Sequence, residues 1–160
     1  MCRLAGRVAD GAIVMGPAEP GMVRRQVEWI EPKEGFEVTF IAPTSTDIED
    51  VRSWASTQAR LLTHHKELPA GLARFRDEIQ RSAETYDYSR HLSVSAEHGE
   101  AVSDELVRAM AIVGSPDECA QRLRELRSAG VDNFIFPLAG RHRLDRWRKI
   151  RDEILGQIMV

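Results

Sequence analysis

The chain has 160 residues, of which 42% are hydrophobic and 29% are charged. These fractions are typical of a globular protein and indicate neither disorder nor a fibrous repeat, so we expect a single domain over residues 1–160. The formal net charge of -3 provides no overall positive field, which argues against nucleic acid as a partner. No apolar run approaches the roughly 20 residues that cross a bilayer, and the N-terminus has no secretory core. We therefore expect a cytoplasmic protein without a membrane partner.

Two strand-helix units are predicted in the first part of the chain. Apolar runs and alternating apolar residues predict the strands, and apolar residues at helical spacing predict the helices. The expected strands cover 12–15 and 36–41, and the expected helices cover 22–30 and 48–62. Because residues 12–15 are all apolar, we expect that strand to be buried. Thr46 and Glu49 have capping-box spacing, which predicts that Thr46 caps the second helix.

The middle of the chain departs from this rhythm. Apolar residues at helical spacing predict a further helix over 68–86, with no strand before it. The stretch 87–100 is polar and aperiodic, which predicts a loop, and Ser103 is placed to cap a short helix that reaches Met110. We interpret residues 67–110 as a helical and loop insertion.

The clearest helix start follows a short apolar segment at 112–113. Ser115, Pro116 and Glu118 supply an N-cap, a proline at the first helical position and a glutamate at the third. This spacing explains Ser115 as a cap, and no G-x-S-x-G surrounds it that would indicate a nucleophile. Cys119 is expected on the buried stripe of the same helix.

A last strand is expected over 131–138 and a last helix over 144–158. Leu144 begins the helix's predicted inner face, whereas its arginines, including Arg146, are expected mostly to point outward. Strands that alternate with helices pair in parallel, so we predict an α/β fold with about three to four parallel strands and flanking helices. A complete (β/α) barrel needs eight strands and about 250 residues. The chain is therefore predicted to be a partial TIM-type barrel.

Several motifs occur in a distinctive order along the chain. They are Ala9-Asp10-Gly11 between a helix and a strand, Tyr86-Asp87-Tyr88 with His91, Val102–Val107, Ile112–Cys119, Arg122-Leu123, and Ala129–Asp132. In this order they resemble the C-terminal half of the luciferase-like monooxygenases, barrel oxidoreductases that use reduced flavin or the deazaflavin F420. The resemblance covers nearly the whole chain, although members of that family are roughly twice as long, as a complete barrel requires.

The resemblance implies a function for the protein as a whole. It implies an oxidoreductase or monooxygenase that uses reduced FMN or F420 on a small organic substrate, with the cofactor performing the hydride or oxygen chemistry. Because the first-half strands are missing, it also implies a pocket completed by self-association into a homo-oligomer or by a partner chain. The alternative is a non-catalytic truncated barrel that acts as an interaction or regulatory module.

Barrel active sites form at the C-terminal ends of the strands, where the strand-to-helix loops converge. By resemblance, the expected cofactor contacts in these loops are Gly16, Ala42, Leu138, Ala139, Gly140 and Arg141. The segment from Arg141 to Arg143 offers donors for a phosphate or carboxylate, and the alternative is a solvated basic helix start.

Histidines are the catalytic candidates, although the signal is weak. His91 in the predicted loop and His142 after the last strand are possible proton donors. Neither has a nearby set of carboxylates or thiolates in the sequence, and the chain contains only Cys2 and Cys119. No metal site is therefore predicted.

Overall fold

Helices and strands alternate along much of the chain in the computed structural model, which describes residues 2–68, 70–90, 101–138 and 142–158. The strands are β1 (Gly11–Val14), β2 (Glu37–Ile41), β3 (Thr44–Ser45), β4 (Ile112–Val113) and β5 (Asn133–Ile135). The α-helices are α1 (Cys2–Val8), α2 (Pro20–Ile30), α3 (Glu49–Ala59), α4 (Ala70–Ala73), α5 (Arg76–Glu84), α6 (Asp104–Met110), α7 (Pro116–Ser128) and α8 (Arg143–Lys149). Shorter helical turns are η1 (Arg60–His64), η2 (Tyr88–Arg90), η4 (Ile150–Ile154) and η5 (Leu155–Gln157).

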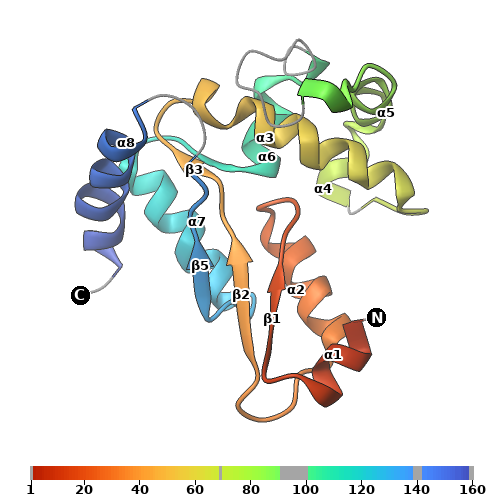
Figure 1. Cartoon of the computed structure of the whole chain (residues 1–160), viewed down its shortest axis with the longest axis vertical. Coiled ribbons are helices and arrows are strands. Elements are labelled where there is room, and N and C mark those ends of the chain that lie inside the picture. The colour runs from red at the N-terminus through yellow and green to blue at the C-terminus, as the bar shows by residue number, and fades with distance from the viewer. Residues whose placement is uncertain (1, 69, 91–100, 139–141, 159–160) are drawn as a thin grey trace.

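A parallel sheet with the strand order β1-β2-β5 lies at the centre of the molecule (Figure 1). The short strand β3 continues from the end of β2 and pairs in parallel with β4. Asp132 fastens the start of β5 to β2, because its carboxylate Oδ2 accepts the N–H of Val38 at 2.8 Å while its own N–H donates to the Val38 carbonyl at 2.9 Å. The predicted α/β fold with parallel strands is confirmed.

The two faces of this sheet have different surroundings. Val38 and Phe40 of β2 point to one face, where they are buried against helices. In Figure 1, α2 and α7 lie behind the strands, and no described helix crosses in front of them. We call this front side the open face, and by strand register it carries Ile13, Met15, Thr39, Ile41 and Ile135.

Exposure of the first strand contradicts the prediction of a buried strand over 12–15. Ile13 is 66% exposed and Met15 is 43% exposed, while Ala12 and Val14 are half-buried toward the helices. Among the described residues the apolar run is therefore covered on one face only, because the described helices that pack on the sheet form one layer, where a parallel sheet normally has cover on both faces.

The start of α7 follows the prediction closely. Ser115 Oγ accepts the N–H of Glu118, and Glu118 Oε2 accepts the N–H of Ser115 at 2.7 Å, which is the reciprocal arrangement of a capping box. The stripe that α7 buries against the sheet includes Cys119, Leu123 and Leu126. The predicted cap and helix are confirmed.

The predicted cap of α3 is wrong. The helix begins at Glu49, whose N–H is accepted by Asp47 Oδ1 at 3.0 Å, and Thr46 forms no capping box. The reason is that residues after β2 stay extended and form β3, so Ser45 Oγ accepts the N–H of Asp47 and starts the turn instead.

The C-terminal elements also differ from expectation. Strand β5 is shorter than 131–138, because its pairing stops before Pro137, which has no N–H to donate. Leu144 is 70% exposed, and Arg146 is only 7% exposed, so both predictions of their orientation are wrong. The buried stripe of this helical segment passes through Arg146, Ile150 and Ile154, which are spaced four residues apart.

The region between β3 and β4 packs as a separate helical layer. The predicted helix over 68–86 is divided into α4 and α5, and α3 ends in the turn η1. A core distinct from that of the sheet includes Val51, Leu72, Ile79 and Leu106. No helix in the described part of the chain has the length and apolarity needed to span a membrane.

Candidate functional site

The C-terminal ends of β1, β2 and β5 lie at the same end of the sheet, since the three strands are parallel (Figure 1). The chain leaves them through Gly16, Ala42 and Phe136. In barrels and other parallel α/β sheets, this end is where ligands bind, because the loops from several strands meet there. This end of the sheet is the candidate functional site.

A partly buried polar network joins the ends of β3 and β5. Ser45 Oγ donates to Asp50 Oδ2 at 2.7 Å, and Arg146 Nη1 lies 3.7 Å from Asp50 Oδ1. Arg146 Nη2 donates to the Pro137 carbonyl at 3.3 Å, and Nη1 donates to the Asp50 carbonyl at 3.5 Å. The arginine thus connects α8, the first turn of α3 and the segment after β5.

Two atoms at this end lack the hydrogen bonds that buried polar groups normally form. Among the described residues, the buried side-chain atoms without a partner are Gln26 Oε1, Arg60 Nε and Arg146 Nε. The Gln26 side chain lies beside the end of β1, since its Nε2 donates to the Met15 carbonyl at 3.1 Å. One free acceptor and one free donor therefore lie beside the ends of β1 and β5, and unpaired buried groups of this kind often mark a ligand position.

Glycine is required at the end of β1 for two reasons. Gly16 has φ +148°, and a Cβ at this position would lie 3.2 Å from Gln26 Nε2. A larger residue would therefore strain the backbone and displace the Gln26 amide.

The other predicted contact residues occupy different environments. Ala42 is buried, and its N–H already donates to the Ile135 carbonyl at 2.8 Å. Leu138 is half-buried against the sheet core, and His142 is exposed, with φ 55° immediately before α8. His91, Ala139, Gly140 and Arg141 lie outside the described residues. Gly16 is the predicted residue that adjoins Gln26, whose Oε1 is one of the unpaired atoms.

Sequence reasoning missed Gln26, Asp50 and Arg146, and helical spacing provides a signal for two of them. Gln26 lies four residues before Ile30 on the buried side of α2, and Arg146 lies four residues before Ile150. A polar residue on an apolar stripe indicates a buried group with a specific partner. Asp50 carries no such signal, because acidic residues are common in the first turn of any helix.

The thiol of Cys119 lies below the end of β3 and is not suited to nucleophilic chemistry. Its Sγ donates to the Ser45 carbonyl at 3.8 Å, and burial raises the pKa of the thiol to about 11. It is therefore protonated at neutral pH and packs as a small hydrophobic group, as predicted.

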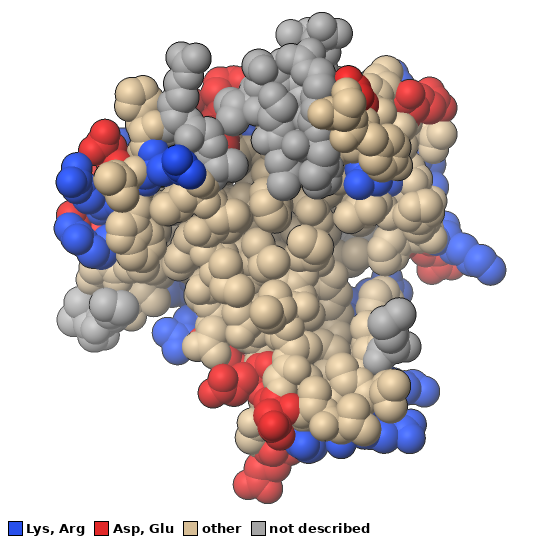
Figure 2. Space-filling view, in the orientation of Figure 1, with Lys and Arg blue, Asp and Glu red and all other residues tan. Residues whose placement is uncertain are grey.

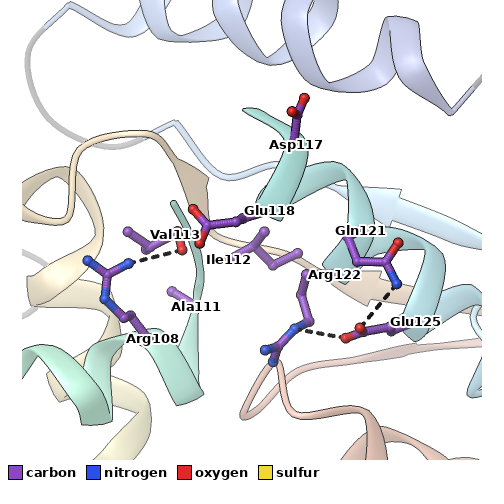
Figure 3. A pocket seen from close by; sticks show the side chains of 9 residues that line it. All are labelled: Arg108, Ala111, Ile112, Val113, Asp117, Glu118, Gln121, Arg122 and Glu125. Atoms are coloured by element: carbon purple, nitrogen blue, oxygen red, sulfur yellow. Dashed lines mark hydrogen bonds and ion pairs between the residues drawn. The ribbon is translucent and has the colours of Figure 1, made fainter. Parts of the chain in front are cut away.

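A hollow of about 480 Å³ lies elsewhere, between α6 and the outer side of α7 (Figure 3). Its charged side chains are already paired, since Arg108 donates to the Val113 carbonyl and Arg122 contacts Glu125 at 3.2 Å. Glu118 is used in the helix cap. We do not assign a ligand to this hollow, because its charged side chains are engaged in contacts within the protein.

Metal-binding residues do not gather at the strand ends. Within residues 2–68, 70–90, 101–138 and 142–158, no group of three or more His, Cys, Asp or Glu side chains is arranged to hold an ion. The chemistry available at the site is that of hydrogen-bond donors and acceptors beside an apolar surface.

Comparison with known proteins identifies the fold and the family. The coenzyme F420 dependent tetrahydromethanopterin reductase from Methanopyrus kandleri has a similar structure, with a TM-score of 0.74 and 18% sequence identity. The similarity covers 98% of this chain and 48% of the reductase, so the chain spans about half the length of that protein. No curated protein matches the chain significantly.

The fold and the position of its strand ends define a partial TIM-type barrel of the α/β class, about half of a complete one. Residues 1–133 match the sequence model of the luciferase-like monooxygenase family. The chain therefore belongs to the luciferase-like monooxygenases, and the predicted resemblance is confirmed.

Proposed function

We propose that the protein is an oxidoreductase of the luciferase-like family that uses reduced flavin or F420 on a small organic substrate. The observation that carries this proposal is the family match over residues 1–133, together with strand ends that gather at one end of the sheet. The similar reductase uses F420, by its name, which favours a deazaflavin or flavin here as well. When bound, such a cofactor supplies hydride or oxygen chemistry.

The residues present at the strand ends fit a flavin-type ring system. Met15, just past the end of β1, contributes an exposed apolar side chain on which a planar ring can lie, and such rings need mostly apolar surroundings. Gln26 Oε1 is a free acceptor beside the end of β1, suited to a ring or ribityl N–H or O–H donor. Arg146 Nε is a free donor beside the end of β5.

Each of these residues has a separate role in the proposed site. Gly16 keeps the turn after β1 low, so that a ring can approach the backbone. Arg146 holds the segment after β5 at a fixed distance from α3 through Pro137 and Asp50. A complete pocket would also need walls from further strands, supplied by another copy or another chain.

Titration with FMN and with F420, oxidised and reduced, tests the proposal. Binding would be followed by absorbance and fluorescence, with light scattering to give the mass of the species that binds. We expect Gly16→Val to weaken binding about tenfold or more, because the new side chain strains the turn and displaces Gln26. Gly35→Val is the matched control, since Gly35 also has a positive φ but lies far from the strand ends with open space around it.

Absence of binding by an assembled oligomer would contradict the proposal. That result would favour the alternative of a non-catalytic interaction or regulatory module.

A further inference from the structure

The open face has the character of an interface. Ile13, Met15 and Ile135 are all more than 40% exposed on it, and its middle carries no charged side chains in Figure 2. The outer edges of β1 and β5 pair with no other described strand. Parallel sheets are normally covered on both faces, and open strand edges are prone to pair with another chain.

The total exposed area supports a missing contact of a particular size. The chain exposes 9105 Å². A monomeric protein of 18.1 kDa typically exposes about 8,100 Å², so the excess is about 1,000 Å². A standard stable interface buries about 800 Å² on each partner. The excess is similar in size to one partner's share of a standard interface.

We infer that the open face binds a second copy of this chain, related by a two-fold axis that runs parallel to the strands. Under this symmetry, β1 of each copy lies beside β5 of the other, and both pairs are parallel. This one rotation pairs the open edges of β1 and β5 in both copies and covers the open face of each copy with that of the other. A two-fold axis perpendicular to the strands would instead place β1 against β1 in antiparallel orientation and leave the β5 edges open.

This inference rests on the proposed function in one respect, because it names the partner that would complete the strand-end site. The dimer can nevertheless be measured without any cofactor.

The first experiment measures the mass of the full chain by light scattering over a range of concentrations. We expect twice the mass of 18.1 kDa for the wild type. Ile13→Glu places a charge at the centre of the interface and should weaken the dimer at least about tenfold, without unfolding a chain in which Ile13 is already exposed. Trp29→Glu is the matched control, because Trp29 is a large exposed apolar residue away from the open face. Ile135→Glu repeats the test at β5.

The second experiment tests the geometry of the pairing by disulfide formation. Ile13→Cys and Ile135→Cys variants, each in a Cys2→Ser background, are oxidised separately and then as a mixture. Within one chain β2 separates β1 from β5 and Ile135 is offset by two residues from the level of Ile13, so these positions lie more than about 10 Å apart, too far for a disulfide. The proposed axis places them on adjacent strands of different copies. We therefore expect cross-linked dimers in the mixture and few in either variant alone.

Several outcomes would overturn the inference. A wild-type chain that stays monomeric at all concentrations would show that a different half-barrel, and not a second copy, covers the face. A dimer that tolerates both glutamate substitutions, or that cross-links equally well through Ile13→Cys alone, would place the contact elsewhere. A dimer that behaves as expected but binds neither FMN nor F420 would support the interface and reject the proposed function.

Discussion

Replacing Asp50 by asparagine should destabilise the protein more than replacing Arg146 by methionine, although both changes break the same ion pair. The Arg146 side chain is 6% exposed and that of Asp50 is 36% exposed, so the two charges depend on the pair to different degrees. Asp50→Asn keeps the shape and the contact with Ser45 but leaves a buried guanidinium with only two carbonyls as partners. Stranding a buried charge costs about 3 kcal/mol at the low end of its range.

Arg146→Met should cost within about 1 kcal/mol, because an apolar side chain of similar length fills the space and the exposed part of Asp50 remains solvated. Urea unfolding followed by circular dichroism measures both variants, at equal protein concentration so that any dimer contributes equally. Arg148→Met is the control, since its pair with Asp145 is exposed and should contribute less than about 0.5 kcal/mol. The reasoning is refuted if Asp50→Asn unfolds at the same or a higher urea concentration than Arg146→Met.

Three further predictions concern the helix caps, the core and the cysteines. Ser115→Ala should cost about 1 kcal/mol through loss of the capping box, whereas Thr46→Ala should cost little; equal losses in urea unfolding would contradict the assigned caps. Leu123→Ala should cost about 3 kcal/mol because Leu123 is fully buried, whereas Leu144→Ala should cost less than about 0.5 kcal/mol, and a thermal scan of the two variants distinguishes them. A thiol reagent at about pH 8 should label exposed Cys2 and spare Cys119, whose pKa burial raises from 9.0 to about 11. Because the native state holds this proton more tightly than the unfolded state, stability should fall as pH rises from about 9 to about 11; Cys119→Ala should lack that part of the fall.

Local patterns predicted the elements whose ends are determined by neighbouring residues. The start of α7 depends on Ser115, Pro116 and Glu118, which all lie within one turn, and it forms as expected. Thr46 and Glu49 offered the same spacing without forming a cap, because long-range pairing of β3 with β4 keeps the chain extended there. The capping-box spacing was the same in the two cases, and the long-range pairing of Thr44 with Ile112 decided against a cap at Thr46.

The position of the candidate site could be predicted from the sequence, whereas most of its residues could not. The parallel strand ends and Gly16 follow from the alternation of elements and from the family resemblance. Arg146 was expected to point outward because arginine is rarely buried. Its burial depends on Asp50, which is distant in sequence, and on the Pro137 carbonyl, so only the folded arrangement of three segments makes an inward guanidinium stable.

The prediction that the first strand is buried is wrong for the isolated chain, but it bears on whether another chain covers that strand. Four successive apolar residues at 12–15 indicate a strand with cover on both faces, yet the described chain covers only the side of Ala12 and Val14. The hydrophobic pattern predicts that both faces of the strand are covered, but it does not indicate which chain covers the second face. Ile13 is therefore a residue type that is typical of protein cores, yet its side chain is exposed like that of a surface residue. A second copy on the open face would reconcile the two, which is why substitution of Ile13 is a direct test of the proposed dimer.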